Sequence, residues 1–302
     1  MTQSLITIDK FSPEATQLRQ VFDERFSDPR QARGDRFVWD WWHVPGQYTA
    51  LRTPAYHYFP KKIYDIFHQQ LVWWGRRNLG CHDVSPTWLS CYIDNCEQEV
   101  HGDVPHGPWA FVFSLTNWKN RTFRGGETLL LREEILNYWG QADFNRGLEH
   151  GDVFQEVQPL FNRLTVFDPR IPHGVRRVQN TTDPREGRLV IHGWFVKPRP
   201  FIEGPLTEKE LKVSIEGLSK KLETEIVAGN ISVHGTLSLR LQINKWGEVE
   251  AMKFLTDSLR SRSLDPQESL RIRKLVKNYF QKEAVFRKRS QGSLVTLPLM
   301  FD

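Results

Sequence analysis

Two histidines and an aspartate stand at positions from which they could bind one metal ion. His101 and Asp103 are separated by a single residue, Gly102, and His173 lies further along the chain. Residues i and i+2 of an extended segment project to the same side, and the glycine leaves the backbone free to adjust. Two imidazoles and a carboxylate can occupy one face of an octahedral iron(II), which leaves positions open for a bidentate cosubstrate and dioxygen. These residues therefore predict an open iron(II) site.

The His-x-Asp spacing alone is ambiguous, because the chain contains it twice. His150-Gly151-Asp152 repeats the tripeptide, and either copy could instead be a polar turn with a hydrogen-bonded histidine. The copy at 101–103 lies between two strand-like runs and well before His173, whereas the copy at 150–152 stands in a polar stretch close to it. We therefore favour the first copy as the ligand pair.

Hydrophobic patterning predicts the elements that must position these side chains. Short apolar runs broken by Gly, Pro, Asn and Asp are typical of strands. The clearest runs are residues 87–93, 109–115, 163–167 and 188–196. They favour a sandwich or barrel over a parallel α/β sheet. Before them, residues 61–74 repeat apolar side chains at three- and four-residue steps, which predicts a helix.

Residues 89–195 resemble the catalytic core of the prolyl-hydroxylase-like branch of the iron(II)/2-oxoglutarate-dependent oxygenases. The matching features, in chain order, are Tyr92, His101-Gly102-Asp103, 114–118, Gly125-Gly126-Glu127, 172–175 and 188–195. The resemblance implies an α+β chain whose core is a double-stranded β-helix, a cupin-like jelly roll, with flanking N-terminal helices. It also implies that His101, Asp103 and His173 are catalytic ligands of Fe(II), with 2-oxoglutarate and dioxygen as cosubstrates.

By the same resemblance, Arg188 binds the distal carboxylate of 2-oxoglutarate. A planar guanidinium suits that role, because it gives a carboxylate two parallel charge-assisted bonds. Arg176 and Arg177 lie nearer His173, but their polar neighbours indicate surface or substrate-facing groups. His192 shares a strand face with Arg188 by period two, and it could bond the cosubstrate or be a core histidine bonded to the backbone.

Tyr92 and Ser114 complete the cosubstrate contacts that the resemblance implies. The family often has a tyrosine where this chain has Ser114, and residues 181–187 lengthen the usual spacing from His173 to Arg188. Neither departure removes a metal ligand.

The resemblance implies oxidative decarboxylation of 2-oxoglutarate to succinate, coupled to hydroxylation. Asp103 argues against halogenation, because halogenating relatives have a small residue there. We expect the substrate to be an amino-acid side chain within a peptide or protein. A free amino acid or small metabolite is an alternative, and so is a non-catalytic, cupin-like metal-binding protein.

Several other side chains could face the substrate. His106 stands where it could reach the mouth of the site. A group of N-terminal aromatic residues could line a groove or belong to the core: Trp39, Trp41, Trp42, Tyr56 and Tyr58.

The chain is predicted to have two domains. Residues 1–197 form the oxygenase domain, with its core at about 86–197, and the proline-rich residues 198–206 form a linker in which prolines prevent regular strand pairing. Residues 207–302 form a small αβ domain that opens with a capping box at Thr207 and Glu210. This part weakly resembles the C-terminal domain of TonB-type proteins, so we expect a binding or dimerising module for a second copy or a protein partner, with plain structural support as the alternative.

Composition excludes some classes of function. The sequence is 39% hydrophobic and 25% charged, as in globular proteins, and its net charge of +5 alone does not indicate nucleic acid binding. We interpret the basic run at 271–290 as a solvated helix face, with a polyanion site as the alternative. Three cysteines are too few for a disulfide framework, and no apolar run could span a membrane. We therefore expect a soluble, cytoplasmic protein.

Overall fold

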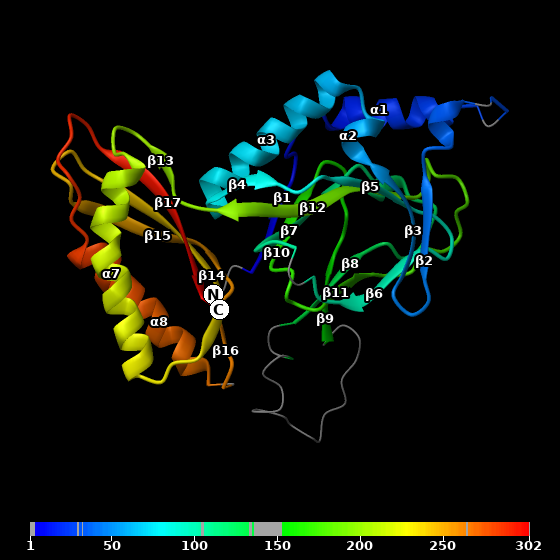
Figure 1. Ribbon diagram of the computed structural model, residues 1–302. Coiled ribbons are helices and arrows are strands. Elements are labelled where there is room, and N and C mark those ends of the chain that lie inside the picture. The colour runs from blue at the N-terminus through cyan, green and yellow to red at the C-terminus, as the bar shows by residue number, and fades with distance from the viewer. Residues whose placement is uncertain are drawn as a thin grey trace. The chain divides into compact units, whose positions relative to one another are not determined.

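The computed structural model describes residues 4–28, 30–31, 33–103, 106–132, 135, 153–263 and 265–301. It divides into two compact units (Figure 1). One combines Leu5–Leu71 with Val84–Val196, and the other combines Met1–Ser4, Val72–Asp83 and Lys197–Asp302. The boundary between the units is therefore not a single cut in the sequence, because residues 72–83 belong with the C-terminal part.

A curled antiparallel sheet of 12 strands dominates the first unit. In pairing order its strands are β1 (Leu5–Ile8), β10 (Leu164–Phe167), β7 (Trp109–Ser114), β12 (Arg188–Pro198), β5 (Trp88–Tyr92), β3 (Tyr48–Pro54), β6 (Glu97–His101), β11 (His173–Val175), β8 (Thr128–Leu131) and β9 (Phe154–Val157), with β2 (Asp40–Val44) on β3 and β4 (Cys81–Val84) on β12. β3 pairs with both β5 and β6, so it joins the two halves of the curled sheet. The predicted α+β class with a jelly-roll core is confirmed.

The four predicted strands correspond to β5, β7, β10 and β12, but the two strands that carry the histidines were not expected. His101 ends β6 and His173 begins β11, instead of following the strands near 93 and 167. β6 has the polar sequence Glu-Gln-Glu-Val-His and β11 has only three residues, so neither shows an apolar alternation. Both segments are held in the extended conformation by hydrogen bonds to neighbouring strands: β6 pairs with β3 and β11, and β11 pairs with β6 and β8.

The helices cover the outer side of this sheet. Figure 1 shows α1 (Ala15–Phe26) and α3 (Lys61–Leu79) along one side of it, with the short α2 (Ala55–Tyr58) between them in the chain. Phe67 of α3 packs on Phe113 of β7 with ring centroids 4.7 Å apart. The 3₁₀ turns η1 (Gly34–Arg36) and η2 (Trp118–Asn120) lie in connections. This packing closes the outer face and leaves the inner face of the curl for a cavity.

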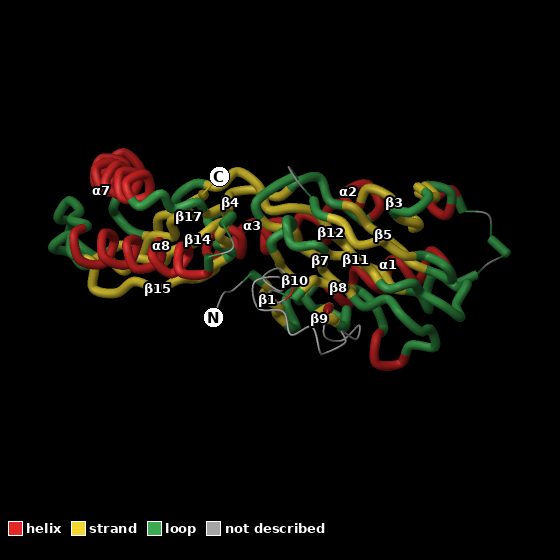
Figure 2. The backbone as a smooth tube through the Cα atoms, turned by 90° about the horizontal axis from the view of Figure 1, so that it is seen from below, coloured by secondary structure: helices red, strands yellow, loops and turns green. Residues whose placement is uncertain are grey.

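The C-terminal unit has its own sheet and two helices. The sheet order is β13 (Phe201–Glu203), β17 (Ser293–Phe301), β14 (Val233–Ile243) and β15 (Val249–Asp257), with β16 (Arg260–Ser261) on β14. Figure 2 shows helices α7 (Glu208–Ala228) and α8 (Pro266–Asn278) beside this sheet, and α8 ends in the π turn η3 (Tyr279–Glu283). Apolar residues of both helices and of the sheet form one buried cluster. The predicted capping box at Thr207 and Glu210 is confirmed. That this unit binds a partner or dimerises stays a prediction.

The expectation that residues 198–206 lack strand pairing is wrong. β12 continues to Pro198, and residues 201–203 form β13, which pairs with β17. Pro200 and Pro205 flank this strand without belonging to it, and an edge strand needs hydrogen bonds on only one side.

None of the helices in the described part of the chain is long and apolar enough to cross a membrane.

Cys81, Cys91 and Cys96 are free thiols and are buried.

Candidate metal centre

Strand pairing brings the two histidines together. In the β6–β11 pair, His173 lies directly opposite His101. Gly174 follows His173 where the strands approach closely, and a Cβ atom there would lie 2.6 Å from the carbonyl oxygen of Gln98. Beyond the end of β6, the amide of Asp103 donates to the carbonyl oxygen of Pro169 at 2.8 Å, which returns the aspartate toward the histidines.

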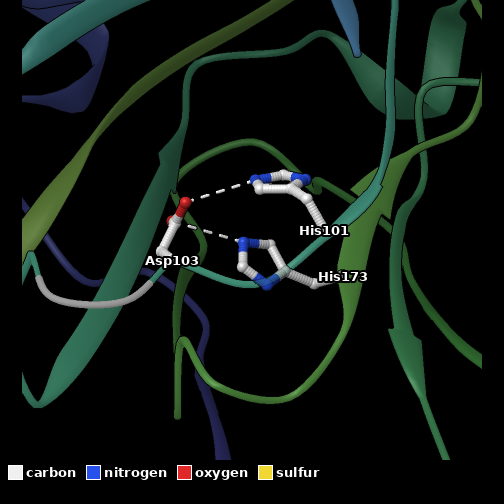
Figure 3. A group of neighbouring side chains, drawn as sticks. All are labelled: His101, Asp103 and His173. Carbon is white, nitrogen blue, oxygen red and sulfur yellow. Dashed lines mark ion pairs between the residues drawn. The ribbon is translucent and has the colours of Figure 1, made fainter. Parts of the chain in front are cut away.

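The three side chains converge on one point (Figure 3). The carboxylate of Asp103 faces both imidazoles, with Oδ1 3.3 Å from Nε2 of His101 and Oδ2 3.4 Å from Nε2 of His173. One potential ligand atom from each residue lies within 4.8 Å of the others. His173 is buried, while His101 and Asp103 are partly exposed. Two nitrogens and a carboxylate arranged in this way suit an iron(II) ion with open positions.

Backbone carbonyls orient both imidazoles for metal binding. Nδ1 of His101 donates to the carbonyl oxygen of Glu99 at 2.7 Å, and Nδ1 of His173 donates to that of Ile171 at 2.9 Å. Because a carbonyl oxygen only accepts, each ring carries its proton on Nδ1 and leaves the Nε2 lone pair for the metal. The side-chain amide of Gln98 lies 3.0 Å from Nε2 of His101 and can donate to that lone pair when no metal holds it.

The charges at the site favour an ionised aspartate. Burial opposes the charge on Asp103, but the hydrogen bonds and charges of His101 and His173 outweigh it and hold its pKa well below the usual range. Burial lowers the pKa of His101, but bonds to Asp103 and to the Glu99 carbonyl outweigh burial, so this pKa is raised. A carboxylate that stays ionised is ready to bind a cation.

Trp194 holds the carboxylate from another strand. Its Nε1 donates to Oδ2 of Asp103 at 3.2 Å. His106 stacks on the indole of Trp194, with ring centroids 4.5 Å apart and planes inclined by 28°. His106 therefore lines the cavity and packs on the tryptophan that contacts a metal ligand, while its contact with a substrate stays a prediction.

The three residues line a cavity of about 780 Å³ that also contains Arg188. Arg188 is only 1% exposed, and its Nη2 donates to Oγ1 of Thr128 at 3.2 Å. Its Nε and Nη1 have no hydrogen-bond partner within the described chain. Burial lowers the pKa of this arginine. A buried guanidinium with free N–H groups in a cavity calls for an anion, and a carboxylate fits its planar shape.

The other predicted cosubstrate residues fall in different places. Tyr92 lines the cavity and lies opposite Arg188 in the β5–β12 pair, with its ring centroid 4.6 Å from the guanidinium carbon. His192 also lines the cavity, with Nε2 2.8 Å from Oγ of Ser90. Burial and the charges of nearby arginines lower its pKa to about 3, so it is neutral at physiological pH. Ser114 is outside the lining, and its hydroxyl donates to the carbonyl oxygen of Pro159 at 2.7 Å.

The two arginines nearest His173 in the sequence form ion pairs with glutamates. Arg176 forms ion pairs with Glu127 and Glu156, and Arg177 pairs with Glu97, as expected of surface groups.

Of the aromatic candidates, Trp42 lines the cavity, Trp39 and Tyr58 pack together with ring centroids 5.3 Å apart, and Trp41 and Tyr56 are exposed. The tripeptide His150-Gly151-Asp152 lies outside the described residues.

Sequence reasoning missed three contributors to the site. Thr128, Trp194 and Arg52 line the cavity, and although Trp194 lies within the matching run 188–195, the sequence assigned none of the three a role. The only available signal was period-two alternation, which places Trp194 on the same face of β12 as Arg188.

Comparison with known proteins identifies the family. Residues 69–196 match the model of the 2OG-Fe(II) oxygenase superfamily. No curated protein sequence matches the chain.

Among solved structures, the chain is similar to a prolyl-4-hydroxylase of Pseudomonas putida, with 18% identity and a TM-score of 0.44 over 65% of this chain and 94% of that one. It is also similar to a Trichoplax adhaerens prolyl hydroxylase in complex with a hypoxia inducible factor peptide fragment, with 16% identity and a TM-score of 0.41 over 64% and 84% of the two chains. HygX from Streptomyces hygroscopicus, with nickel, 2-oxoglutarate and hygromycin B bound, has 13% identity and a TM-score of 0.40 over 64% and 82%.

The family match confirms the resemblance seen in the sequence. Members of this superfamily use Fe(II), 2-oxoglutarate and dioxygen, and the residues present suit them. The donor set of His101, Asp103 and His173 fits the metal, and the free nitrogens of Arg188 fit a carboxylate. The chain is therefore a 2-oxoglutarate-dependent dioxygenase whose residues 69–196 belong to the 2OG-Fe(II) oxygenase superfamily.

Proposed function

We propose that this protein hydroxylates an amino-acid side chain within a peptide or protein. His101, Asp103 and His173 hold the iron, and Arg188 binds the distal carboxylate of 2-oxoglutarate. One observation carries the proposal: a single cavity contains both the three converging donors and a buried guanidinium with free N–H groups. Bound iron(II), 2-oxoglutarate and dioxygen supply the oxidising chemistry, which yields succinate and carbon dioxide and places a hydroxyl on the substrate.

The residues of the chain contribute position and exclude water. Thr128 and Tyr92 hold Arg188 in place, so the cosubstrate carboxylate meets a guanidinium that needs no rearrangement. Neutral His192 adds a polar group beside it without a charge of its own. A cavity of about 780 Å³ is within the usual range for small-molecule sites, and it leaves space beside 2-oxoglutarate for a substrate side chain.

Anaerobic titration with iron(II) and 2-oxoglutarate tests the metal centre. A visible charge-transfer band from the chelate should appear in the wild type and be absent in His173→Ala. Absence of the band from the wild type, or absence of iron-dependent succinate release in air, would leave a non-catalytic metal-binding protein as the better account.

Substrate class needs a separate assay. Peptides and free amino acids are offered in parallel, and the product is examined by mass spectrometry for a gain of one oxygen atom. Oxygenation of peptides supports the proposal. Oxygenation of free amino acids alone would assign the enzyme to small metabolites.

A further inference from the structure

A second arginine of the cavity, Arg52, has a partly buried guanidinium. It lies on β3, on the wall that also carries Trp42 and Trp88. It forms no ion pair with any described residue, and its buried Nε lacks a hydrogen-bond partner among them. Burial lowers the pKa of Arg52. A partly desolvated guanidinium without an acceptor is costly unless a ligand supplies one.

Two indoles hold this guanidinium in place. Its central carbon lies 3.1 Å from the ring centroid of Trp42 and 4.1 Å from that of Trp88. The two rings are themselves 6.0 Å apart and inclined by 62°. Aromatic faces attract the cation but accept few in-plane N–H groups, so these contacts orient Arg52 while leaving its hydrogen-bonding edge available.

The position of Arg52 connects it to the metal centre along the cavity wall. Ring centroids of Trp42 and Tyr48 are 6.1 Å apart, and Tyr48 pairs with Gln98 across β3 and β6. The Gln98 amide in turn contacts His101. Arg52 is therefore linked to the metal centre through neighbouring residues of the cavity wall, and its charge also acts on Tyr92 and His192 of the same lining.

Charges around the cavity favour an anion at this point. Among its described lining residues only Asp103 and Glu99 are acidic, and Glu99 is exposed. Asp40 lies opposite Arg52 in the β2–β3 pair and its charge favours the charged form of Arg52, but Asp40 is exposed and no ion pair joins the two side chains. Arg188 is the other arginine of the lining, and under the proposed function it binds the distal carboxylate of 2-oxoglutarate. That carboxylate is then not available to Arg52.

We infer that Arg52, held by Trp42 and Trp88, binds a carboxylate of the substrate, and that the substrate is a peptide with an acidic side chain close to the hydroxylated residue. This inference rests on the proposed function. A guanidinium can bind a carboxylate through two parallel N–H bonds, and such a charged contact changes affinity by about tenfold or more.

Two peptide pools test the inference. Both are blocked at each end and have a central position mixed over all natural residues, and they differ only in carrying Glu or Gln on both sides of it. The wild type, with iron(II) and saturating 2-oxoglutarate, should oxygenate the Glu pool about tenfold faster than the Gln pool. Rates are measured as succinate release above the peptide-free rate, with the gain of oxygen confirmed by mass.

Variants of Arg52 test whether this residue causes the preference for the Glu pool. Arg52→Gln should lose the preference for the Glu pool, and Arg52→Lys should keep part of it because the charge remains. Arg121→Gln is the matched control, since Arg121 also stacks on an indole, that of Trp118, but does not line the cavity. It should keep the full preference.

Each other outcome has a distinct meaning. Equal oxygenation of both pools by the wild type, or a preference that survives in Arg52→Gln, overturns the inference and leaves the proposed function standing. Oxygenation of neither pool counts against the proposed function itself. Loss of peptide-free succinate release in Arg52→Gln, restored by excess 2-oxoglutarate, would show that Arg52 binds the cosubstrate and would also overturn the inference.

Discussion

His101 and His173 are cross-strand neighbours, with ring centroids 4.5 Å apart, although a long stretch of chain separates them. Their meeting depends on the register of β6 against β11, because a slip of one residue would turn one imidazole to the other face of the sheet. The aspartate joins them from the segment that directly follows β6. A metal site built in this way needs all three residues.

Asp103→Ala should abolish iron-dependent succinate release. The loss should exceed the roughly 10–100-fold cost of removing a contact that only supports a ligand, because a ligand itself is removed. Asp152→Ala, in the second copy of the tripeptide, is the matched control and should retain most activity. The reverse result would move the active site to the second copy.

Arg188→Ala should raise the KM for 2-oxoglutarate by about tenfold to a hundredfold, because charged hydrogen bonds to the distal carboxylate are lost. Iron binding without cosubstrate should change little. Arg176→Ala serves as the control, since Arg176 pairs with Glu127 and Glu156. Steady-state kinetics at varied 2-oxoglutarate give the comparison, and equal KM values for the two variants would contradict the assignment.

Trp194→Phe should weaken iron(II) binding while preserving the ring that packs against His106. The variant loses the indole N–H that bonds Oδ2 of Asp103, and loss of such a supporting contact costs about tenfold in metal affinity. Competition with a chelator of known affinity measures the change. Unaltered affinity would mean that the carboxylate is positioned without this bond.

His192→Gln should reduce the loss of stability in acid. In the folded chain the pKa of His192 is about 3, below its ordinary value of 6.5, so the unfolded state binds more protons between these values. The contribution of neutral His192 is therefore present above pH 6.5 and is lost as pH falls toward 3. Urea unfolding of the metal-free protein between neutral and acidic pH should show a shallower decline in the variant; parallel curves would contradict this.

Gly125→Ala should destabilise the fold by at least about 2 kcal/mol, because the backbone there is left-handed and an added Cβ would overlap the carbonyl oxygen of Arg177. Gly217→Ala is the contrasting change. This glycine lies inside α7, and apart from its chain neighbours and the backbone of its own helix no atom lies within 4 Å of a new Cβ, so the variant should gain about 0.5–1 kcal/mol. Thermal unfolding of both variants tests the pair.

Much of the fold could be predicted because its signals are local. Apolar runs in the sequence predicted β5, β7, β10 and β12. The leucines that alternate along β14 are buried, as the two-residue period of a strand predicts. β6 and β11 could not be predicted, since a polar or three-residue segment becomes a strand only when its partners hold it. The pairing of residues 201–203 escaped prediction for the same reason.

The sequence by itself determined which donor types are present and their order along the chain, and this was sufficient to predict the family and an iron(II) site. Only the tertiary structure decided how individual side chains are used. It turned Ser114 away from the cavity, brought Trp194 onto Asp103, and placed Arg52 between two indoles. These outcomes depend on strand register and on contacts between distant segments, which local periodicity does not encode.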